Sequence, residues 1–136
     1  MAAMSDLRTF FAADRFAAGA GIELVDVSEG FARARLRVEP RHLNAAGVVQ
    51  GGAVFTLADF AFAAAANSHG TVALATGAHV AFVKAVSAGT LVAEAREDAR
   101  TRRTSTCTVR VTDDAGEVVA LFTGTAYRRD DPVPLP

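Results

Sequence analysis

The chain has 136 residues, of which 51% are hydrophobic and 21% charged, a size and composition typical of one folded domain. Its formal net charge of −1 provides no field that attracts nucleic acid, so we expect no nucleic-acid partner. The single cysteine, Cys107, forms no intramolecular disulfide, and residues 1–9 lack the basic start and apolar core of a signal peptide, so a cytoplasmic location is expected. The densest apolar stretch, 53–66, is too short to span a bilayer and contains Asp59, so no membrane partner is expected either.

The first half of the chain predicts helix, hairpin and helix in that order. Residues 5–18 have the pattern of a short capped helix that ends at two glycines. Segments 22–27 and 31–38 flank a turn, and basic residues alternate with apolar ones in the second segment, which predicts a hairpin with one solvated face. A glycine-containing loop then leads into 53–66, which is apolar all round, as a buried helix is.

The second half predicts four further strands at 72–83, 91–100, 104–112 and 118–128, separated by turn signals. The tail 130–136 holds three of the four prolines, and we expect it to be frayed. We treat 1–136 as a single domain with its core at about 21–128. An α+β fold in which the antiparallel sheet wraps around the apolar helix buries that helix. One face or edge would remain uncovered, so we expect a homodimer.

Three features around the start of the apolar helix indicate chemistry. Gly51 and Gly52, placed just before the predicted helix, would expose its first free N–H groups as an oxyanion site, although two glycines also suit a tight turn. Asp59 is the only charge in the helix, and an isolated carboxylate there is costly unless it is paired or solvated. Asn44 offers an amide that either positions a water or carbonyl or serves as an ordinary turn residue.

The segment LNAAGVVQGGAVFTLADFAFAAAANSHG at 43–70 resembles the hot dog fold acyl-CoA thioesterases, most closely the PaaI-like phenylacetate branch. The resemblance continues through GTLVAEA at 89–95 and VVALFTGTAYR at 118–128. It implies a curved antiparallel sheet around one long helix, assembled as dimers that share active sites and commonly as homotetramers. The implied reaction is the hydrolysis of an acyl-CoA, with an aryl-acyl group such as phenylacetyl or hydroxyphenylacetyl, to a free acid and coenzyme A.

The same resemblance assigns roles to residues of this chain. Asp59 matches the catalytic carboxylate, as base toward water or as nucleophile, and the backbone N–H of Gly52 polarises the thioester carbonyl. Asn44 matches the amide that holds water or substrate. Gln50 stands where the family usually has a histidine, and because glutamine donates a hydrogen bond but does not titrate, any acid role of that histidine is lost.

Binding residues follow from the same comparison. Beside Gly51, the basic residues and hydroxyl donors expected near the phosphates of coenzyme A are Lys84, Arg102, Arg103 and Thr104. An apolar, aromatic-friendly acyl pocket is expected from Phe60 together with Phe55, Phe62, Phe82 and Phe122. Arg102 and Arg103 equally suit a solvated turn, and each phenylalanine equally suits the core.

We expect no metal and no cofactor, since coenzyme A is part of the substrate. The histidines His42, His69 and His79 lack the spacing of a metal site, and Cys107 has the setting of a small core residue. Hydratases of the same fold need a titratable histidine paired with a carboxylate, and none lies at 44–59. The remaining alternatives are a non-catalytic acyl-CoA sensor and a thioesterase for short-chain or medium-chain fatty acyl-CoA.

Overall fold

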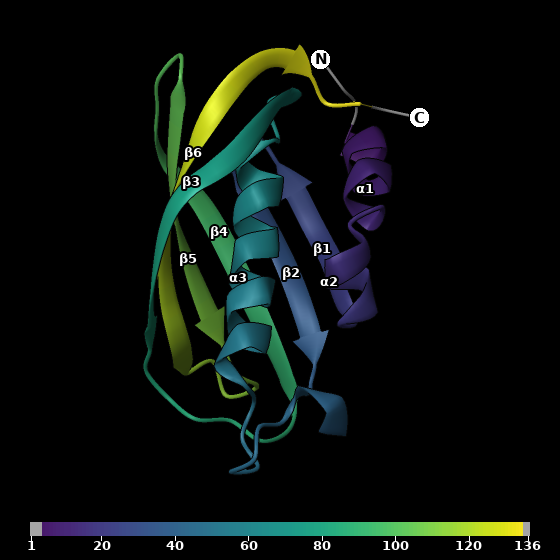
Figure 1. Ribbon diagram of the computed structural model, residues 1–136, viewed down its shortest axis with the longest axis vertical. Helices are drawn as coiled ribbons and strands as arrows, with labels where there is room; N and C mark the ends of the chain where they lie inside the picture. The colour runs from purple at the N-terminus through teal and green to yellow at the C-terminus, as the bar shows by residue number, and fades with distance from the viewer. Residues whose placement is uncertain (1–3, 135–136) are drawn as a thin grey trace.

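The computed structural model describes residues 4–134 as a six-stranded antiparallel sheet curved around one long helix. Figure 1 shows this helix, α3 (Gly51–Ala66), lying on the concave side of the sheet. The strands lie side by side in the order β1-β2-β4-β5-β6-β3. Their bounds are β1 Ile22–Ser28, β2 Phe31–Arg37, β3 Thr71–Phe82, β4 Thr90–Arg100, β5 Thr104–Thr112 and β6 Val118–Pro132. The predicted α+β fold is confirmed.

Period-two alternation places the thin side chains of the sheet beneath the helix. In β2, Ala32 and Ala34 are fully buried, whereas the arginines that alternate with them face outward. They pair with Ala95 and Ala93 of β4, which are equally buried. Because alanine extends so little from the backbone, α3 packs close to the sheet at these positions.

The structure also confirms the predicted buried helix, except for one face that is open along the length of the helix. Nine residues of α3 are buried, among them Leu57, Ala58 and Phe62. A stripe that includes Gly52, Thr56 and Asp59 is only partly covered or exposed. These positions recur at helical spacing, so a single face of α3 remains open, and the site must be sought on that face.

The N-terminal segment differs from the single helix predicted at 5–18. It forms α1 (Met4–Ala12) and α2 (Arg15–Gly19), separated by a turn at Ala13 and Asp14. Asp14 adopts an extended conformation, and its side chain accepts a hydrogen bond from the N–H of Ala17 at 3.0 Å. An aspartate that caps a new helix also ends the previous one, which explains the break.

The prediction of a frayed tail at 130–136 is wrong for residues 130–134, the described part of that range. The last strand runs to Pro132, which pairs with Thr71 at the start of β3. Val133 is 3% exposed, and its N–H donates to the carbonyl of Gly70 at 2.9 Å. Edge pairing and this buried valine hold the segment despite its prolines. Residues 135 and 136 lie outside the described part of the chain.

The two edges of the sheet are covered unequally. Beside β1 lies α1, whose Leu7 and Phe11 are buried. At the other edge, β3 pairs with β6 alone among the described strands, and Leu74 and Phe82 of β3 are 55% and 56% exposed. An open strand edge with apolar side chains is a surface that another strand can pair with. Within residues 4–134, no helix has the length and apolarity needed to cross a membrane.

Candidate active site

The first turn of α3 has a different geometry from the one predicted. Gly51 and Gly52 do not precede the helix but form its first two residues, and Gln50 is its N-cap. The side-chain oxygen of Gln50 accepts a hydrogen bond from the N–H of Gly52, while the N–H of Gln50 itself donates to the carbonyl of His42 at 2.8 Å. A capping side chain supplies the acceptor that lets the helix start at the glycines.

The free backbone donor at this end of the helix is therefore Gly51. Among the described residues its N–H has no acceptor, whereas the N–H of Gly52, expected to polarise a carbonyl, is occupied by Gln50. An unpaired N–H at the positive end of a helix dipole favours an oxyanion. A Cβ at Gly51 would come within 3.2 Å of the Phe82 ring, so a larger residue at this position would crowd that ring.

Asp59 lies two turns further along the open face of α3. It is half-buried and has no hydrogen bond or ion pair to another described residue. Burial raises the pKa of its carboxyl above the ordinary range, and the negative charge of Asp14 raises the pKa further. A carboxylate that is not neutralised and holds a proton more tightly than usual suits general-base or nucleophilic chemistry.

Gly51 and Asp59 of one chain lie too far apart to act on the same carbonyl. They are eight positions apart in one helix, which at about 1.5 Å per residue separates their backbones by about 12 Å. A thioester group is much smaller than this distance. A complete site with both residues therefore requires a second helix of the same kind.

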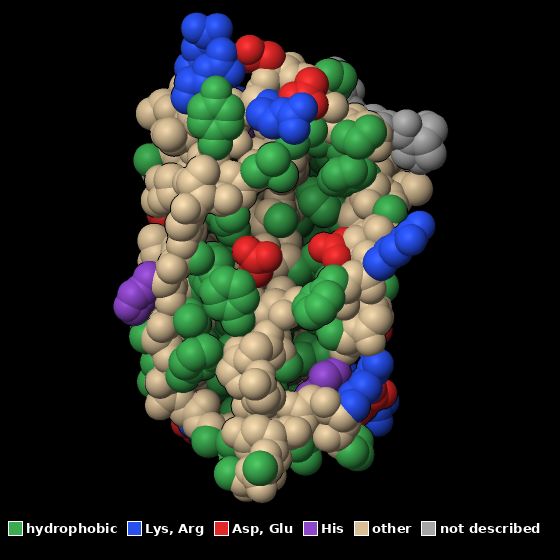
Figure 2. Space-filling view, in the orientation of Figure 1, with side chains coloured by type: hydrophobic (Ala, Val, Ile, Leu, Met, Phe, Trp, Pro, Cys, Tyr) green, Lys and Arg blue, Asp and Glu red, His purple; other side chains and the backbone are tan. Residues whose placement is uncertain are grey.

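A groove of about 800 Å³ lies between α2, the short 3₁₀ helix η1 (Pro40–His42) and the first turns of α3. Figure 2 shows this face of the molecule hollowed and largely apolar, with acidic side chains at mid-height over α3 and toward α2. The lining residues used below are Arg15, Phe16, Leu43, Gln50, Phe55 and Thr56. Sequence reasoning missed Arg15 and Phe16, because only packing brings α2 against the start of α3, and it also missed Thr56 within α3 itself.

Two predicted site residues have structural roles in this chain. The Asn44 oxygen accepts from the N–H groups of Ala46 at 2.9 Å and Val48 at 3.2 Å, as in a turn stabilised by its own side chain. Phe60 is 5% exposed and packs edge-to-face on Phe11, with 6.2 Å between ring centroids. For Asn44 the structure favours the turn alternative, and for Phe60 it favours the core alternative.

The predicted phosphate-binding residues are mostly engaged elsewhere. Lys84 contacts Asp113 at 2.6 Å and Glu117 at 3.1 Å, and these bonds raise the pKa of its ammonium group. Arg103 forms a two-bond pair with Asp130. Thr104 shares a hydrogen bond with Thr101, and the Arg102 side chain has no partner among the described residues. Arg102 to Thr104 lie at the β4–β5 turn, at the opposite end of the molecule from Gly51 (Figure 1).

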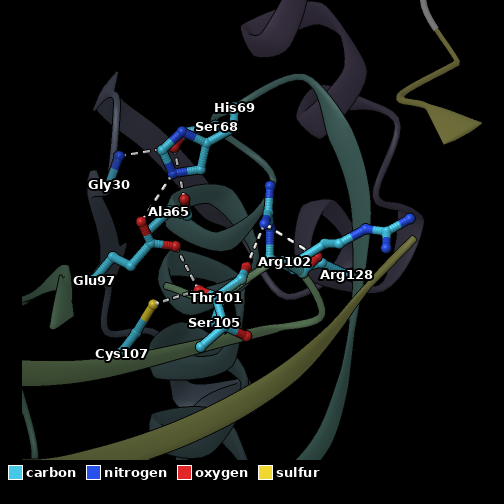
Figure 3. Close-up of polar contacts among 10 residues, drawn as sticks. All are labelled: Gly30, Ala65, Ser68, His69, Glu97, Thr101, Arg102, Ser105, Cys107 and Arg128. Atoms are coloured by element: carbon cyan, nitrogen blue, oxygen red, sulfur yellow. Dashed lines mark hydrogen bonds and ion pairs between the residues drawn. The ribbon is translucent and has the colours of Figure 1, made fainter. Parts of the chain in front are cut away.

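A second polar cluster lies near the C-terminal end of α3, as Figure 3 shows. Glu97 of β4 contacts the His69 ring at 2.8 Å and accepts from the Ser105 hydroxyl at 2.5 Å, and Ser105 contacts Cys107 at 3.7 Å. The carboxylate lies between His69 and Ser105, so no histidine activates the serine, and we assign the cluster a structural role. The period-two pattern of β4 puts Glu97 on its inward face, a signal that the sequence did contain.

The curved antiparallel sheet wrapped around one long helix defines a hot dog fold protein. The family model described as "Domain of unknown function (DUF4442)" matches residues 5–127. Acyl-coenzyme A thioesterase PaaI of Escherichia coli K12 is 34% identical over 116 residues, which cover 85% of this chain and 83% of that protein. The chain therefore belongs to the PaaI-like hot dog thioesterase family.

Solved structures agree with this assignment. The E. coli PaaI structure, from the phenylacetic acid degradation operon, has a TM-score of 0.91 at 29% identity and covers 96% of this chain and 95% of its own. A structure of the phenylacetic acid degradation protein PaaI from Thermus thermophilus has a TM-score of 0.82 at 36% identity. The match covers 85% of this chain and 100% of the Thermus chain. Streptococcus mutans smu.793 bound to acetyl-CoA has a TM-score of 0.76 at 26% identity. The match covers 79% of this chain and 88% of the smu.793 chain.

Proposed function

We propose that this protein hydrolyses an acyl-CoA thioester to a carboxylic acid and free coenzyme A, with Asp59 as the catalytic carboxylate. The observation that carries the proposal is the position of Asp59, half-buried and unpaired among the described residues on the one open face of an apolar helix. The family relation supports it, since PaaI of E. coli is an acyl-coenzyme A thioesterase.

In the proposed reaction the ionised Asp59 acts as base toward water or as nucleophile at the thioester carbonyl. The carbonyl oxygen gains negative charge as the tetrahedral intermediate forms. We assign the N–H of Gly51 to this oxygen, because Gln50 occupies the N–H of Gly52. Collapse of the intermediate breaks the C–S bond and releases coenzyme A as the thiolate. If Asp59 is the nucleophile, the acyl group remains on it as a mixed anhydride, which water then hydrolyses to the free acid and the Asp59 carboxylate. Water supplies the oxygen and protons, so the proposed step requires no cofactor.

We further propose that two subunits share each site. An antiparallel second copy of α3, related by a two-fold axis, brings Asp59 of one chain toward Gly51 of the other. The open edge of β3, with exposed Leu74 and Phe82, supplies a surface for such a homodimer. Assembly of two dimers into a homotetramer stays a prediction that light scattering tests, and the cytoplasmic location likewise stays a prediction.

The substrate assigned to this site is an aryl-acyl-CoA, such as phenylacetyl-CoA or hydroxyphenylacetyl-CoA. Phe16, Phe55 and Leu43 give the groove an apolar, partly aromatic wall that suits a ring. Two PaaI relatives carry a phenylacetic acid degradation name, and smu.793 is bound to acetyl-CoA. Short-chain and medium-chain fatty acyl groups are the competing substrates. For the phosphates we retain Arg102, because Lys84 and Arg103 have carboxylate partners.

A thiol-release assay over a panel of CoA thioesters tests both the reaction and the acyl preference. Phenylacetyl, hydroxyphenylacetyl, benzoyl and straight-chain thioesters are compared, with wild type beside Asp59→Asn. We expect the variant to lose about two orders of magnitude in kcat with a smaller change in KM, because an amide neither takes the proton nor attacks. A folded variant that retains a third of wild-type activity contradicts the assignment of Asp59. No turnover of any thioester contradicts the proposed reaction.

Subunit complementation tests the shared site. Asp59→Asn is mixed with Gly51→Val, each checked for its fold by circular dichroism, under conditions that exchange subunits. In a mixed dimer one site carries both changes and the other carries neither, so activity should return toward half of the wild-type level per heterodimer. If exchange is demonstrated and no activity returns, each site belongs to one chain.

A further inference from the structure

The α1–α2 elbow brings a second carboxylate, that of Asp14, close to the part of α3 that carries Asp59. Phe11 lies three residues before Asp14 and packs edge-to-face on Phe60, the residue that follows Asp59. Asp14 and Phe60 also line a common cavity of about 260 Å³. The elbow is therefore packed directly against the part of α3 that carries Asp59.

Several contacts hold Asp14 in this position. Its N–H donates to the carbonyl of Phe11 at 3.0 Å, and its side chain caps α2 by accepting from the N–H of Ala17 at 3.0 Å. The far end of α2 is held by Arg41, which donates to the carbonyl of Gly19 at 2.6 Å. The short helix that Asp14 caps is thus anchored at both ends, and the position of Asp14 does not depend on a flexible terminus.

Most of the other charged groups around α3 are directed away or paired. The inward side chains of β2, β4 and β5 under α3 are apolar except Glu97 and Ser105, while the other charged side chains alternate onto the opposite face of the sheet. Glu97 and His69 pair with each other near the end of the helix. On the N-terminal side, Arg8 binds the carbonyl of Val25. The remaining charged residues nearby are Glu23, paired with Arg35, Arg15 on the groove and the exposed His79 of β3.

We propose that Asp14 is a positioning residue of the reaction centre: its negative charge, held close to the segment of α3 that carries Asp59, shifts the pH range in which Asp59 is ionised and therefore active. This inference rests on the proposed function of Asp59. A negative charge close to a carboxyl group disfavours the ionisation of that group. The field of Asp14 raises the pKa of Asp59 in addition to burial. Asp59 must be ionised to act, so wild-type activity is lost as the pH falls through this raised pKa.

The variant Asp14→Asn separates the charge of Asp14 from its structural role. Asparagine caps a helix as well as aspartate does, so α2 is retained while the charge is removed. Asp14→Ser, a second neutral cap, guards against a folding defect specific to asparagine. The matched control is Asp6→Asn, which removes the same charge from an exposed position in the first turn of α1.

Two measurements are made on each folded variant. The first is the acid limb of kcat/KM for the best thioester of the panel. The second is the titration of the Asp59 carboxyl carbon by ¹³C NMR, identified as the resonance missing from Asp59→Asn. We expect both midpoints to move to lower pH in Asp14→Asn and Asp14→Ser and to stay in place in Asp6→Asn. High salt should move wild type in the same direction, because it screens an exposed charge.

The outcomes distinguish this inference from the proposed function. If Asp59→Asn is inactive but the two Asp14 variants leave both midpoints in place, Asp14 has no electrostatic role. If the two Asp14 variants lose activity equally at every pH and neither midpoint shifts, Asp14 acts only as the structural cap of α2, and the proposal is also overturned. If no thioester is hydrolysed, the proposed function fails, and the NMR titration still decides whether Asp14 controls the ionisation of Asp59.

Discussion

The buried carboxylate of Glu97 offers a direct test of what holds the end of α3 to the sheet. Glu97 accepts from Ser105 and contacts His69, and all three side chains are largely shielded from water, with side-chain exposures of 9% for Glu97 and 12% for His69. Its backbone N–H also donates to Gly30 in the β1–β2 turn, and the N–H of Gly30 donates to Ser68. The cluster in Figure 3 therefore joins that turn, α3 and two strands.

Glu97→Ala removes two hydrogen bonds to a charged group and leaves the Ser105 hydroxyl without its acceptor. Each such bond contributes about 1.5–3 kcal/mol, and the desolvation of the carboxylate offsets part of the total, so we expect a loss of roughly 3 kcal/mol in the free energy of unfolding. In a domain of this size this corresponds to a fall in Tm of roughly 10 °C. Glu97→Gln, which keeps an acceptor and the side-chain volume, should lose less.

Urea and thermal unfolding followed by circular dichroism at pH 7 measure these differences. The control is Asp98→Ala, which removes the same charge from the next residue, where the side chain is exposed. A surface change of this kind should alter stability by less than about 0.5 kcal/mol. If Glu97→Ala is no less stable than Asp98→Ala, the cluster does not hold the fold together and our account of it is wrong.

Two further predictions follow from displaced pKa values. Because the folded state raises the pKa of Asp59, ionising it opposes folding: stability falls as pH rises through the interval between its unfolded and folded pKa values. Asp59→Asn should therefore have a higher Tm than wild type at pH 7, with the gap closing below the ordinary carboxyl range, and an equal Tm at pH 7 would contradict this reasoning. Burial raises the pKa of the Cys107 thiol to about 11, so Ellman's reagent at pH 8 should label the protein only after denaturation; rapid labelling of native protein would show that Cys107 is accessible.

Local pattern was sufficient to predict most of the elements. The alternation of apolar and basic residues in 31–38 predicted β2, and the uniformly apolar 53–66 predicted the body of α3. Errors arose where one side chain determines a boundary. Asp14 ends α1 by capping α2, and Gln50 lets α3 begin two residues early at Gly51. Such caps depend on side-chain conformation, which periodicity does not report.

The lone carboxylate of the site could also be identified from the sequence alone. An unpaired charge in an apolar helix is costly, and that cost singled out Asp59 before any packing was known. The resemblance at 43–70 led to the same residue and to the family. It did not show which glycine N–H is free, because that depends on where the Gln50 side chain lies.

The tertiary structure alone decided which charges are neighbours. Arg103 was expected at phosphates, yet the end of β6 brings Asp130 against it, while Arg102 beside it has no partner among the described residues. Asp14 and Asp59 are far apart along the chain, and the charge of Asp14 acts on Asp59 because the α1–α2 elbow packs against α3. Electrostatic interactions depend on distance in space, whereas hydrophobic periodicity depends on distance along the chain. The sequence therefore determined the elements and the catalytic candidate, and the packing determined the environment in which that carboxylate titrates.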